Sequence, residues 1–250
     1  MAANALVDKV ALVTGGGGGI GSAICRQLAE AGAHLVLNYN SNAQKAETVA
    51  ETLAGNNHLV VQASVTDSAA LAQMAAQVST HYGRLDLLVN NAGITRPVPH
   101  DDLDGLDDAI IDQIFQTNVR GAFACVRAFK QLLMADEGGT VINISSIAGR
   151  TGVGSNVAYC ASKAAMDSMT RSLARALAPQ IRVVSVSPGW VWGEYASRFS
   201  EAYIQEQINK TPLARIAQPE DVAAAVLAVA TQLTFSTGCI IPVDGGRPLL

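Results

Sequence analysis

The chain is poor in charged and in aromatic residues. Of its 250 residues, 15% are charged and 5% are Phe, Trp or Tyr, whereas 49% are hydrophobic. So much apolar sequence with so little charge argues against disorder and supports one large buried core. The 17 Lys and Arg against 21 Asp and Glu give a net charge of −4, and no basic run occurs. The sequence therefore predicts no binding of nucleic acid or of an anionic membrane surface.

Cysteines are few and scattered. Cys25, Cys125, Cys160 and Cys239 lack the C-x-x-C spacing of metal and redox sites, so we expect reduced thiols, no metal and a cytoplasmic protein. Cys160 adjoins Tyr159, but small buried cysteines are common and no chemical role is expected. The apolar stretch 222–230 is far too short to span a membrane, and residues 1–8 are too short and polar for a signal peptide.

Short β-branched runs alternate with longer alanine-rich amphipathic segments. The expected strands are 10–14, 35–39, 59–63, 85–90, 140–145, 181–187 and 239–243. The expected helices are 20–31, 43–53, 68–82, 106–135, 157–177 and 219–233. This alternation is typical of a parallel sheet with helices on both faces. The sequence thus predicts a single α/β domain over residues 1–250, with a Rossmann-type doubly wound sheet of seven parallel strands.

Segment 190–213 interrupts the alternation. It carries Trp190, Trp192, Tyr195, Phe199 and Tyr203 between a Pro-Gly turn and the next helix. Loops with exposed aromatic side chains often close over a ligand. We expect a substrate lid here, and packing against a partner subunit is an equally good interpretation.

Tyr159 and Lys163 form a Y-x-x-x-K motif, and Ser146 lies thirteen residues before the tyrosine. Residues four apart on a helix lie one above the other on the same face. A neighbouring ammonium favours the phenolate and lowers the pKa of a tyrosine from its usual value of about 10. Tyr159 would then exchange a proton with a substrate oxygen to which the Ser146 hydroxyl also bonds. The same spacing is common in solvated surface pairs, so the other motifs must decide.

A glycine-rich turn, 14–21, directly follows the first expected strand and precedes a helix. Its sequence is T-G-G-G-G-G-I-G, from Thr14 to Gly21. Glycines there let the backbone approach a pyrophosphate, whose charge is attracted by the N–H groups and dipole of the helix. No Lys-Ser or Lys-Thr pair follows, which excludes the phosphate loop of nucleoside triphosphatases. The turn therefore predicts a dinucleotide site.

Six motifs, in order, resemble a short-chain dehydrogenase/reductase over about residues 8–246. They are T-G-x-x-x-G-I-G, Asn90-Asn91-Ala92-Gly93, Asn118, Ser146, Tyr159-x-x-x-Lys163 and Pro188-Gly189. The resemblance implies an oxidoreductase in which Tyr159 exchanges a proton with the substrate oxygen while a nicotinamide exchanges hydride with the same carbon. Lys163 would lower the pKa of the tyrosine and bind the nicotinamide ribose, and Ser146 would polarise the carbonyl. Asn118 would hold a water that links Lys163 to solvent, the alternative being a polar residue that faces out of a helix.

The resemblance also assigns the cofactor site. The expected residues are Gly15, Gly19, Ile20, Gly21, Asn38, Ser41, Ser64, Val65, Asn91, Ala92, Gly93, Tyr159, Lys163, Pro188, Gly189 and Val191. Ile20 and Gly21 would face the pyrophosphate, Val65 the adenine and Val191 the carboxamide. Ser64 replaces an acidic or amide residue that many members use for the adenine amine, and Gly193 replaces a common threonine, so both contacts are in doubt.

The end of the second strand carries no carboxylate. An acidic residue there would bind the ribose hydroxyls and repel a 2'-phosphate, which selects NAD. This chain has Asn38 instead, followed by Ser41 and Asn42, whose neutral groups can accept a phosphate. NADP(H) is therefore favoured, with NAD(H) possible. Gly18 stands where NADP-using members often carry Arg or Lys, which weakens the preference.

The leading interpretation is a ketone reductase similar to the 3-oxoacyl-thioester reductases of the family. The aromatic residues of 190–213 favour a hydrophobic ketone, bound between that segment and 94–103. An acyl-carrier-protein partner would need a basic patch, for which the candidates are Arg96, Arg150, Arg198 and Arg215.

Three other functions are weighed. An NAD-dependent secondary alcohol dehydrogenase uses the same residues. A non-catalytic nucleotide sensor would have no reason to keep Ser146, Tyr159 and Lys163 together. An extended-type epimerase or dehydratase would need a different loop spacing and a longer C-terminal substrate domain. By the same resemblance we expect a homotetramer, with a dimer as the alternative.

Overall fold

Short runs of β-branched residues and leucine form one parallel sheet. The strands are β1 (Val10–Thr14), β2 (His34–Tyr39), β3 (Leu59–Gln62), β4 (Leu87–Asn90), β5 (Gly139–Ile144), β6 (Ile181–Pro188) and β7 (Ile240–Val243). Their order is β3-β2-β1-β4-β5-β6-β7, with every neighbouring pair parallel. The computed structural model describes residues 4–193 and 196–249. The predicted doubly wound, seven-stranded Rossmann-type sheet is confirmed.

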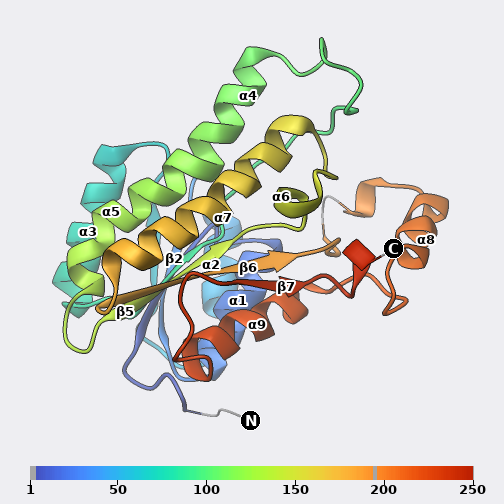
Figure 1. Cartoon of the computed structure of the whole chain (residues 1–250). Coiled ribbons are helices and arrows are strands. Elements are labelled where there is room, and N and C mark those ends of the chain that lie inside the picture. The colour runs from blue at the N-terminus through green and yellow to red at the C-terminus, as the bar shows by residue number, and fades with distance from the viewer. Residues whose placement is uncertain (1–3, 194–195, 250) are drawn as a thin grey trace.

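Helices cover both faces of this sheet (Figure 1). On one face lie α1 (Gly19–Glu30), α2 (Ala43–Glu51) and α9 (Pro219–Thr231); on the other lie α3 (Ser68–Tyr82), α5 (Ala122–Leu133) and α7 (Val157–Leu177). Strand side chains alternate between two apolar clusters: Val13 and Leu37 pack on the α1 side, Leu12 and Val36 on the α3 side. Burial on both faces explains why these strands are almost continuously apolar in the sequence.

The segment predicted as one helix over 106–135 is interrupted. It forms α4 (Asp108–Phe115), a single π-helical stretch η1 (Gln116–Gly121) and then α5. Short π-helical stretches inside α-helices occur frequently at functional sites. Asn118 lies within this one.

Four short helical elements were not predicted individually. They are α6 (Ala148–Thr151), η2 (Ala196–Arg198), α8 (Glu201–Asn209) and η3 (Arg247–Leu249). Two of them, η2 and α8, make up much of the segment expected to be a lid. Among the described residues, no helix is both long and apolar enough to cross a bilayer.

The sheet order creates a crevice beside β1. The chain passes from β1 outward to β2 and β3, and then returns to β4 on the other side of β1. In open parallel sheets, ligands bind at the carboxyl ends of the strands where the order reverses in this way. The glycine turn follows β1 and the Asn91-Ala92-Gly93 loop follows β4, so both lie at this crevice.

Candidate active site

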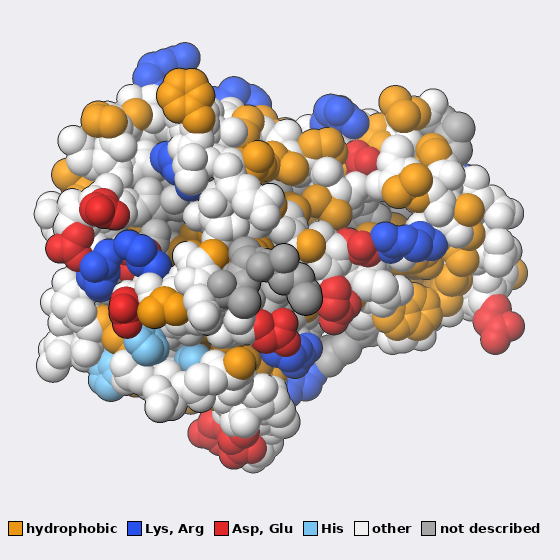
Figure 2. Space-filling model, turned by 90° about the horizontal axis from the view of Figure 1, so that it is seen from below, with side chains coloured by type: hydrophobic (Ala, Val, Ile, Leu, Met, Phe, Trp, Pro, Cys, Tyr) orange, Lys and Arg blue, Asp and Glu red, His pale blue; other side chains and the backbone are white. Residues whose placement is uncertain are grey.

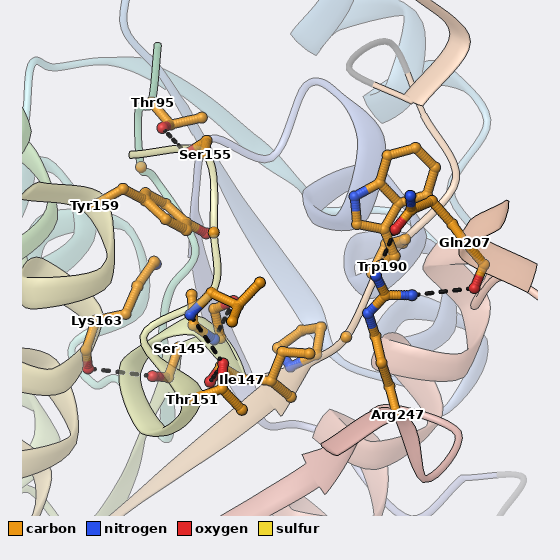
Figure 3. A pocket seen from close by; sticks show the side chains of 18 of the residues that line it. Thr95, Ser145, Ile147, Thr151, Ser155, Tyr159, Lys163, Trp190, Gln207 and Arg247 are labelled. Carbon is orange, nitrogen blue, oxygen red and sulfur yellow. Dashed lines mark hydrogen bonds between the residues drawn. The ribbon is translucent and has the colours of Figure 1, made fainter. Parts of the chain in front are cut away.

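A cavity of about 920 Å³ opens at the carboxyl ends of the strands. Its walls come from segments 91–95, 144–148, 151–155, 188–191, 203–210 and 247–248, together with Ile20, Tyr159 and Lys163. Figure 3 shows Tyr159 and Lys163 on one side, with Trp190, Gln207 and Arg247 on the other. Ser146 also lines the cavity, so the structure brings the three expected catalytic side chains to one space.

Tyr159 and Lys163 project from the same face of α7. The Lys163 Nζ lies 5.7 Å from the centroid of the Tyr159 ring. The ammonium donates a hydrogen bond of 2.7 Å to the backbone oxygen of Ile144, at the end of β5. This bond fixes the lysine against the strand that leads to Ser146, which places charge and hydroxyl groups around one point.

Burial sets the proton affinity of Lys163. The residue is only 5% exposed. Burial disfavours the charged ammonium and lowers the pKa of Lys163 to about 8, while the Asp167 carboxylate one turn further along α7 opposes this and raises the pKa. The lysine therefore titrates near neutral pH, in the range useful for proton transfer.

Asn156 determines where α7 begins and how Tyr159 is held. Its Oδ1 accepts a hydrogen bond of 2.6 Å from the Tyr159 backbone N–H, which caps the first turn of the helix. Its Nδ2 donates a 2.7 Å bond to the backbone oxygen of Arg96. The buried side chain thus ties the tyrosine to the loop after β4, which lines the cavity on the same side.

Asn118 is completely buried, with 0% of its surface exposed. The alternative of a polar residue facing out of its helix is therefore wrong. Its Oδ1 accepts from the Ile94 N–H at 2.8 Å, and its Nδ2 donates to the Ile94 oxygen at 3.0 Å and to Ser162 Oγ at 3.1 Å. A Cβ at Gly93 would lie 3.3 Å from Asn118 Oδ1 and 3.7 Å from Lys163 Nζ, so the asparagine and the lysine flank the same glycine.

The glycine turn needs its glycines for two reasons. Gly15 and Gly19 have φ angles of +66° and +49°, a region that L side chains rarely adopt. At Gly21 a Cβ would lie 2.2 Å from the Gly15 oxygen, closer than real atoms approach. At Gly18, by contrast, a Cβ would have no heavy atom within 4 Å. The turn is therefore tightly folded but open on the side where α1 begins, as a bound phosphate requires.

The loop after β4 is hydrogen-bonded to the glycine turn. Thr14 Oγ1 accepts from the N–H groups of Asn91, at 3.0 Å, and Ala92, at 2.9 Å. Asn91 Nδ2 donates to the backbone oxygens of Thr14 at 2.9 Å and Gly15 at 3.2 Å. The two expected halves of the cofactor site are thus one hydrogen-bonded unit.

The expected lid contributes aromatic side chains to the cavity. Trp190 and Tyr203 line it, and Phe199 packs on both rings, with centroid distances of 5.6 and 4.6 Å. Trp192 is 40% exposed and does not line the cavity. Tyr195 lies outside the described residues.

Sequence reasoning missed the polar residues of the far wall. Glu206 and Gln207 come from α8, Lys210 directly follows that helix, and Arg247 comes from η3. None belongs to a motif. The available signals were weak: an amphipathic stretch after the aromatic segment and an arginine after the Gly-Gly pair that follows the last strand. Within the described part of the chain, no group of three or more His, Cys, Asp or Glu side chains could hold a metal ion.

Comparison with known proteins decides the family. A family model described as enoyl-(acyl carrier protein) reductase matches residues 15–247. A Streptomyces violaceoruber protein provisionally named ketoacyl reductase 2 of the granaticin polyketide synthase is 38% identical over 254 residues and is covered completely, as is this chain. The chain belongs to the short-chain dehydrogenase/reductase family.

Two further relatives cover nearly the whole chain. The 3-oxoacyl-(acyl-carrier-protein) reductase FabG of Staphylococcus aureus (strain Mu50) is 36% identical over 96% of this chain and 98% of its own length. The crystal structure of a short-chain dehydrogenase/reductase, glucose/ribitol dehydrogenase type, from Brucella melitensis superposes with a TM-score of 0.91 at 29% identity, covering 98% of both chains. As a short-chain dehydrogenase/reductase, the protein is an oxidoreductase with a nicotinamide cofactor.

One residue expected at the cofactor site of this dehydrogenase/reductase is turned into the sheet. Asn38 is 2% exposed, and its Nδ2 donates to the backbone oxygens of Ala63 at 2.9 Å and Val61 at 3.3 Å. It lies two residues after Val36, on the face covered by α3 and α5. In this conformation the amide joins β2 to β3 and has no hydrogen left for a phosphate. Ser41, in contrast, is exposed beyond the end of β2.

The expected adenine residues also differ in position. Ser64 Oγ bonds to Thr66 Oγ1 at 2.9 Å, and Val65 is buried against η1, since a Cβ at Gly121 would lie 2.8 Å from Val65 Cγ2. Neither lines the cavity, nor do Gly15, Gly19, Gly21, Asn38, Ser41 and Ala92. The described cavity therefore covers the nicotinamide and substrate end of the expected site.

The loop after β6, where the resemblance places the nicotinamide, contributes backbone to the cavity wall. Pro188, Gly189 and Val191 line the cavity. The Trp192 N–H donates to the Ala217 oxygen at 2.8 Å, and the Ala217 N–H donates to the Trp190 oxygen at 3.1 Å. In a parallel bridge of this kind, the N–H and C=O of the middle residue, Val191, point away from the partner strand. They are thus free to face a carboxamide.

Proposed function

We propose that this short-chain dehydrogenase/reductase reduces a ketone to a secondary alcohol with NADPH, through Ser146, Tyr159 and Lys163. The observation that carries the proposal is that these three polar side chains line one cavity together with several apolar side chains. The names of the relatives as ketoacyl reductases support it. An NAD-dependent secondary alcohol dehydrogenase is the alternative.

The carbon and the oxygen of the carbonyl react with different groups. The nicotinamide, when bound, supplies hydride to the carbon. Tyr159 gives its hydroxyl proton to the oxygen, while Ser146 donates a hydrogen bond that stabilises the negative charge developing there. Lys163 favours the phenolate left on Tyr159 because it places a buried positive charge beside the ring. Asn118, which flanks Gly93 together with Lys163, would hold the water through which the proton is replaced.

The chain offers a site that fits the cofactor. The glycine turn would hold the pyrophosphate through Gly15, Gly19, Ile20 and Gly21, and Val191 the carboxamide. Asn91, Ala92 and Gly93 would face the adenine ribose side, and Ser64 and Val65 the adenine. Asn38 would first have to release its amide from β3, so Ser41 is the better candidate for a 2'-phosphate.

The preference for NADP(H) rests on the missing carboxylate at the end of β2. It should strengthen in a Gly18→Arg variant, because this position has extended backbone and no heavy atom within 4 Å of a Cβ. A guanidinium there can pair with the 2'-phosphate. The ratio of kcat/KM for NADPH over NADH should rise about tenfold or more. An unchanged ratio would place the phosphate elsewhere.

The substrate is proposed to be a small-molecule ketone. Of the four arginines considered for an acyl-carrier protein, Arg215 makes two hydrogen bonds to Asp221, at 2.6 and 2.8 Å, and Arg150 lies 3.9 Å from Asp244. These two guanidinium groups are already paired with carboxylates. The side chain of Arg198 lies outside the described part of the structure. On the face seen in Figure 2, Lys and Arg are scattered among Asp and Glu.

Oligomeric state and location are also proposals. Phe115 on α4, Phe123 on α5 and Val157 at the start of α7 are exposed apolar residues, which suits a homotetramer built on these helices. Sedimentation should give four times the chain mass.

Burial raises the pKa of Cys25 and of Cys125 to about 12, so these thiols are unreactive. This agrees with the proposed cytoplasmic location.

The proposal is tested with a substrate panel. Ketones and matched α,β-unsaturated thioesters are offered with NADPH and with NADH, and loss of nicotinamide absorbance is followed. We expect turnover of ketones, faster with NADPH. Turnover of the unsaturated thioesters alone would make the protein a double-bond reductase, in line with the description of the family model.

A further inference from the structure

The wall opposite Tyr159 carries one arginine that is built into the fold. Arg247 lies on η3 and reaches α8, where its Nη1 donates to the Gln207 backbone oxygen at 3.0 Å and its Nη2 donates to Gln207 Oε1. Gln207 is only 3% exposed. Figure 3 shows the guanidinium beside Gln207 and Trp190, across the cavity from Tyr159 and Lys163. Three of its five donor hydrogens remain for a ligand.

The turn before Arg247 holds its backbone in place. Gly245 and Gly246 have φ angles of +63° and +82°. The Gly246 N–H donates to Asp244 Oδ1 at 2.9 Å, and the Leu213 N–H donates to the Gly245 oxygen at 3.1 Å. The arginine is thus fixed at both ends, by this turn and by Gln207, and needs little reorganisation to bind a ligand.

Charge is unbalanced in the cavity. Its lining contains three cations, Lys163, Lys210 and Arg247, and one carboxylate, Glu206. Glu206 is ion-paired with Lys210, and Lys163 donates to the Ile144 oxygen. None of the ion pairs among the described residues includes Arg247.

Arg247 is a partly buried cation in need of a counter-charge. Burial lowers the pKa of Arg247, with Tyr203 and Glu206 acting in the opposite direction, and a guanidinium stays protonated at neutral pH. Glu206 offsets this charge only in part, because it is ion-paired with Lys210, and an anionic ligand group would lower the remaining cost of burying the charge. The chain as a whole carries −4, so the far end of the cavity is a positive site in an acidic protein.

The cavity is also lined by apolar side chains, among them Ile94, Ile147, Val153 and Trp190. A molecule that fits has a carbonyl at the Ser146 and Tyr159 end, a hydrophobic middle, and a negative group at the Arg247 end.

We propose that Arg247 binds a carboxylate of the substrate, and that the enzyme acts on keto acids whose carboxylate is separated from the ketone by an apolar body. The inference rests on the proposed ketone reduction. A carboxylate suits a single guanidinium, which binds it through two parallel hydrogen bonds. A phosphate monoester shares this anionic chemistry and forms a separate arm of the test.

The test compares matched ketones. Aryl ketones that end in a carboxylate are paired with their methyl esters and with the corresponding phosphate monoesters, at three chain lengths. Wild type is measured beside Arg247→Gln, Arg247→Lys and, as a charge-matched surface control, Arg175→Gln, an exposed position in the last turn of α7 that does not line the cavity. Wild type should favour the acid over its ester by about tenfold or more in kcat/KM, and over the phosphate. Arg247→Gln should abolish this preference, because it should raise KM for the acid much more than KM for its ester. Arg247→Lys should keep part of the preference.

The contradicting results are equally specific. Equal turnover of acid and ester by wild type, or an equal loss of both in Arg247→Gln, overturns the role of Arg247 but leaves ketone reduction intact. Preference for the phosphate overturns the carboxylate.

A binding arm is independent of turnover. Calorimetric titration of the enzyme–NADPH complex compares a saturated carboxylate with its amide. Binding of the carboxylate to wild type but not to Arg247→Gln supports the proposal even if no ketone is reduced, a result that would sink only the proposed reaction. No binding of the carboxylate to wild type overturns the role of Arg247.

Discussion

The two ends of the cavity are built in different ways. The end proposed for catalysis, called the catalytic end below, takes Ser146, Tyr159 and Lys163 from one short stretch of chain, fixed by hydrogen bonds to backbone groups, such as that from Lys163 to Ile144. The substrate end takes Trp190, Gln207 and Arg247 from three separate segments, held by ring packing and by two hydrogen bonds from Arg247 to Gln207. Backbone anchoring suits chemistry that must be positioned closely, whereas side-chain packing leaves room for substrates to differ.

This difference predicts which kinetic parameter each variant changes. Changes at the catalytic end should lower kcat, because they remove interactions with the transition state. Changes at the substrate end should raise KM, because they remove binding that ground state and transition state share.

Replacing Ser146 with Ala should have the largest effect among the supporting residues. Loss of one hydrogen-bond donor to a developing oxyanion costs about 10²–10³ in kcat. Ser172→Ala is the control, since Ser172 is exposed on α7 and does not line the cavity. Steady-state kinetics with NADPH measure both. Equal effects of the two changes would show that Ser146 has no special role.

Trp190→Ala should test the substrate end. Its ring packs on Phe199 and, at a centroid distance of 5.7 Å, on Tyr203. Removing it should raise KM for an aryl ketone about tenfold and change kcat little, since aromatic contacts contribute about 0.5–1.5 kcal/mol beyond buried area. Trp192→Ala, outside the cavity, should leave KM unchanged. A fall confined to kcat in Trp190→Ala would erase the distinction between the two ends.

Asn156→Ala should weaken the anchoring of the catalytic end. Loss of the cap on α7 should lower the free energy of unfolding by about 1–2 kcal/mol and lower kcat, because Tyr159 is no longer tied to the loop after β4. Asp107→Ala removes a comparable cap, a 2.8 Å bond to the Ile110 N–H at the start of α4, and Asp107 does not line the cavity. It should lower stability alone. Denaturant unfolding and kinetics on both variants separate stability from positioning.

The pH profile gives the smallest expected effect. Burial lowers the pKa of Lys163 to about 8, so the ammonium is lost, and ketone reduction should fall, as pH rises through that value. Asp167 raises the pKa of Lys163, so Asp167→Asn should move the alkaline limb of kcat/KM to lower pH. Asp136 is paired with Arg84 at the amino ends of the strands, opposite the cavity, and Asp136→Asn should not move the alkaline limb. If the alkaline limb does not move in Asp167→Asn, the limb reports the titration of a group other than Lys163.

Sequence predicted the catalytic end because its geometry is local. A four-residue spacing places two side chains on one helix face wherever the helix lies, and α7 has the expected bounds. The π-helical stretch at Asn118 was not predicted, because a local widening of the helix depends on how it packs against α7 and the loop after β4.

The substrate end could not be predicted in the same way. Arg247 and Gln207 meet only because η3 and α8 pack together, and no spacing along the chain encodes that contact. The inward direction of Asn38 was predictable in principle, because side chains alternate along a strand and Val36 already belongs to the α3 side. The error came from treating Asn38, the last residue but one of β2, as part of the following loop.

The central claim is that Tyr159 supplies the proton for ketone reduction, and Tyr159→Phe tests it most directly. NADPH oxidation with the best ketone and the dissociation constant of NADPH, from nicotinamide fluorescence, are measured on the same protein. We predict a loss of about 10²–10⁴ in kcat, with the dissociation constant within about threefold of wild type. A variant that retains its activity, or one that loses activity only because it no longer binds NADPH, would contradict the account.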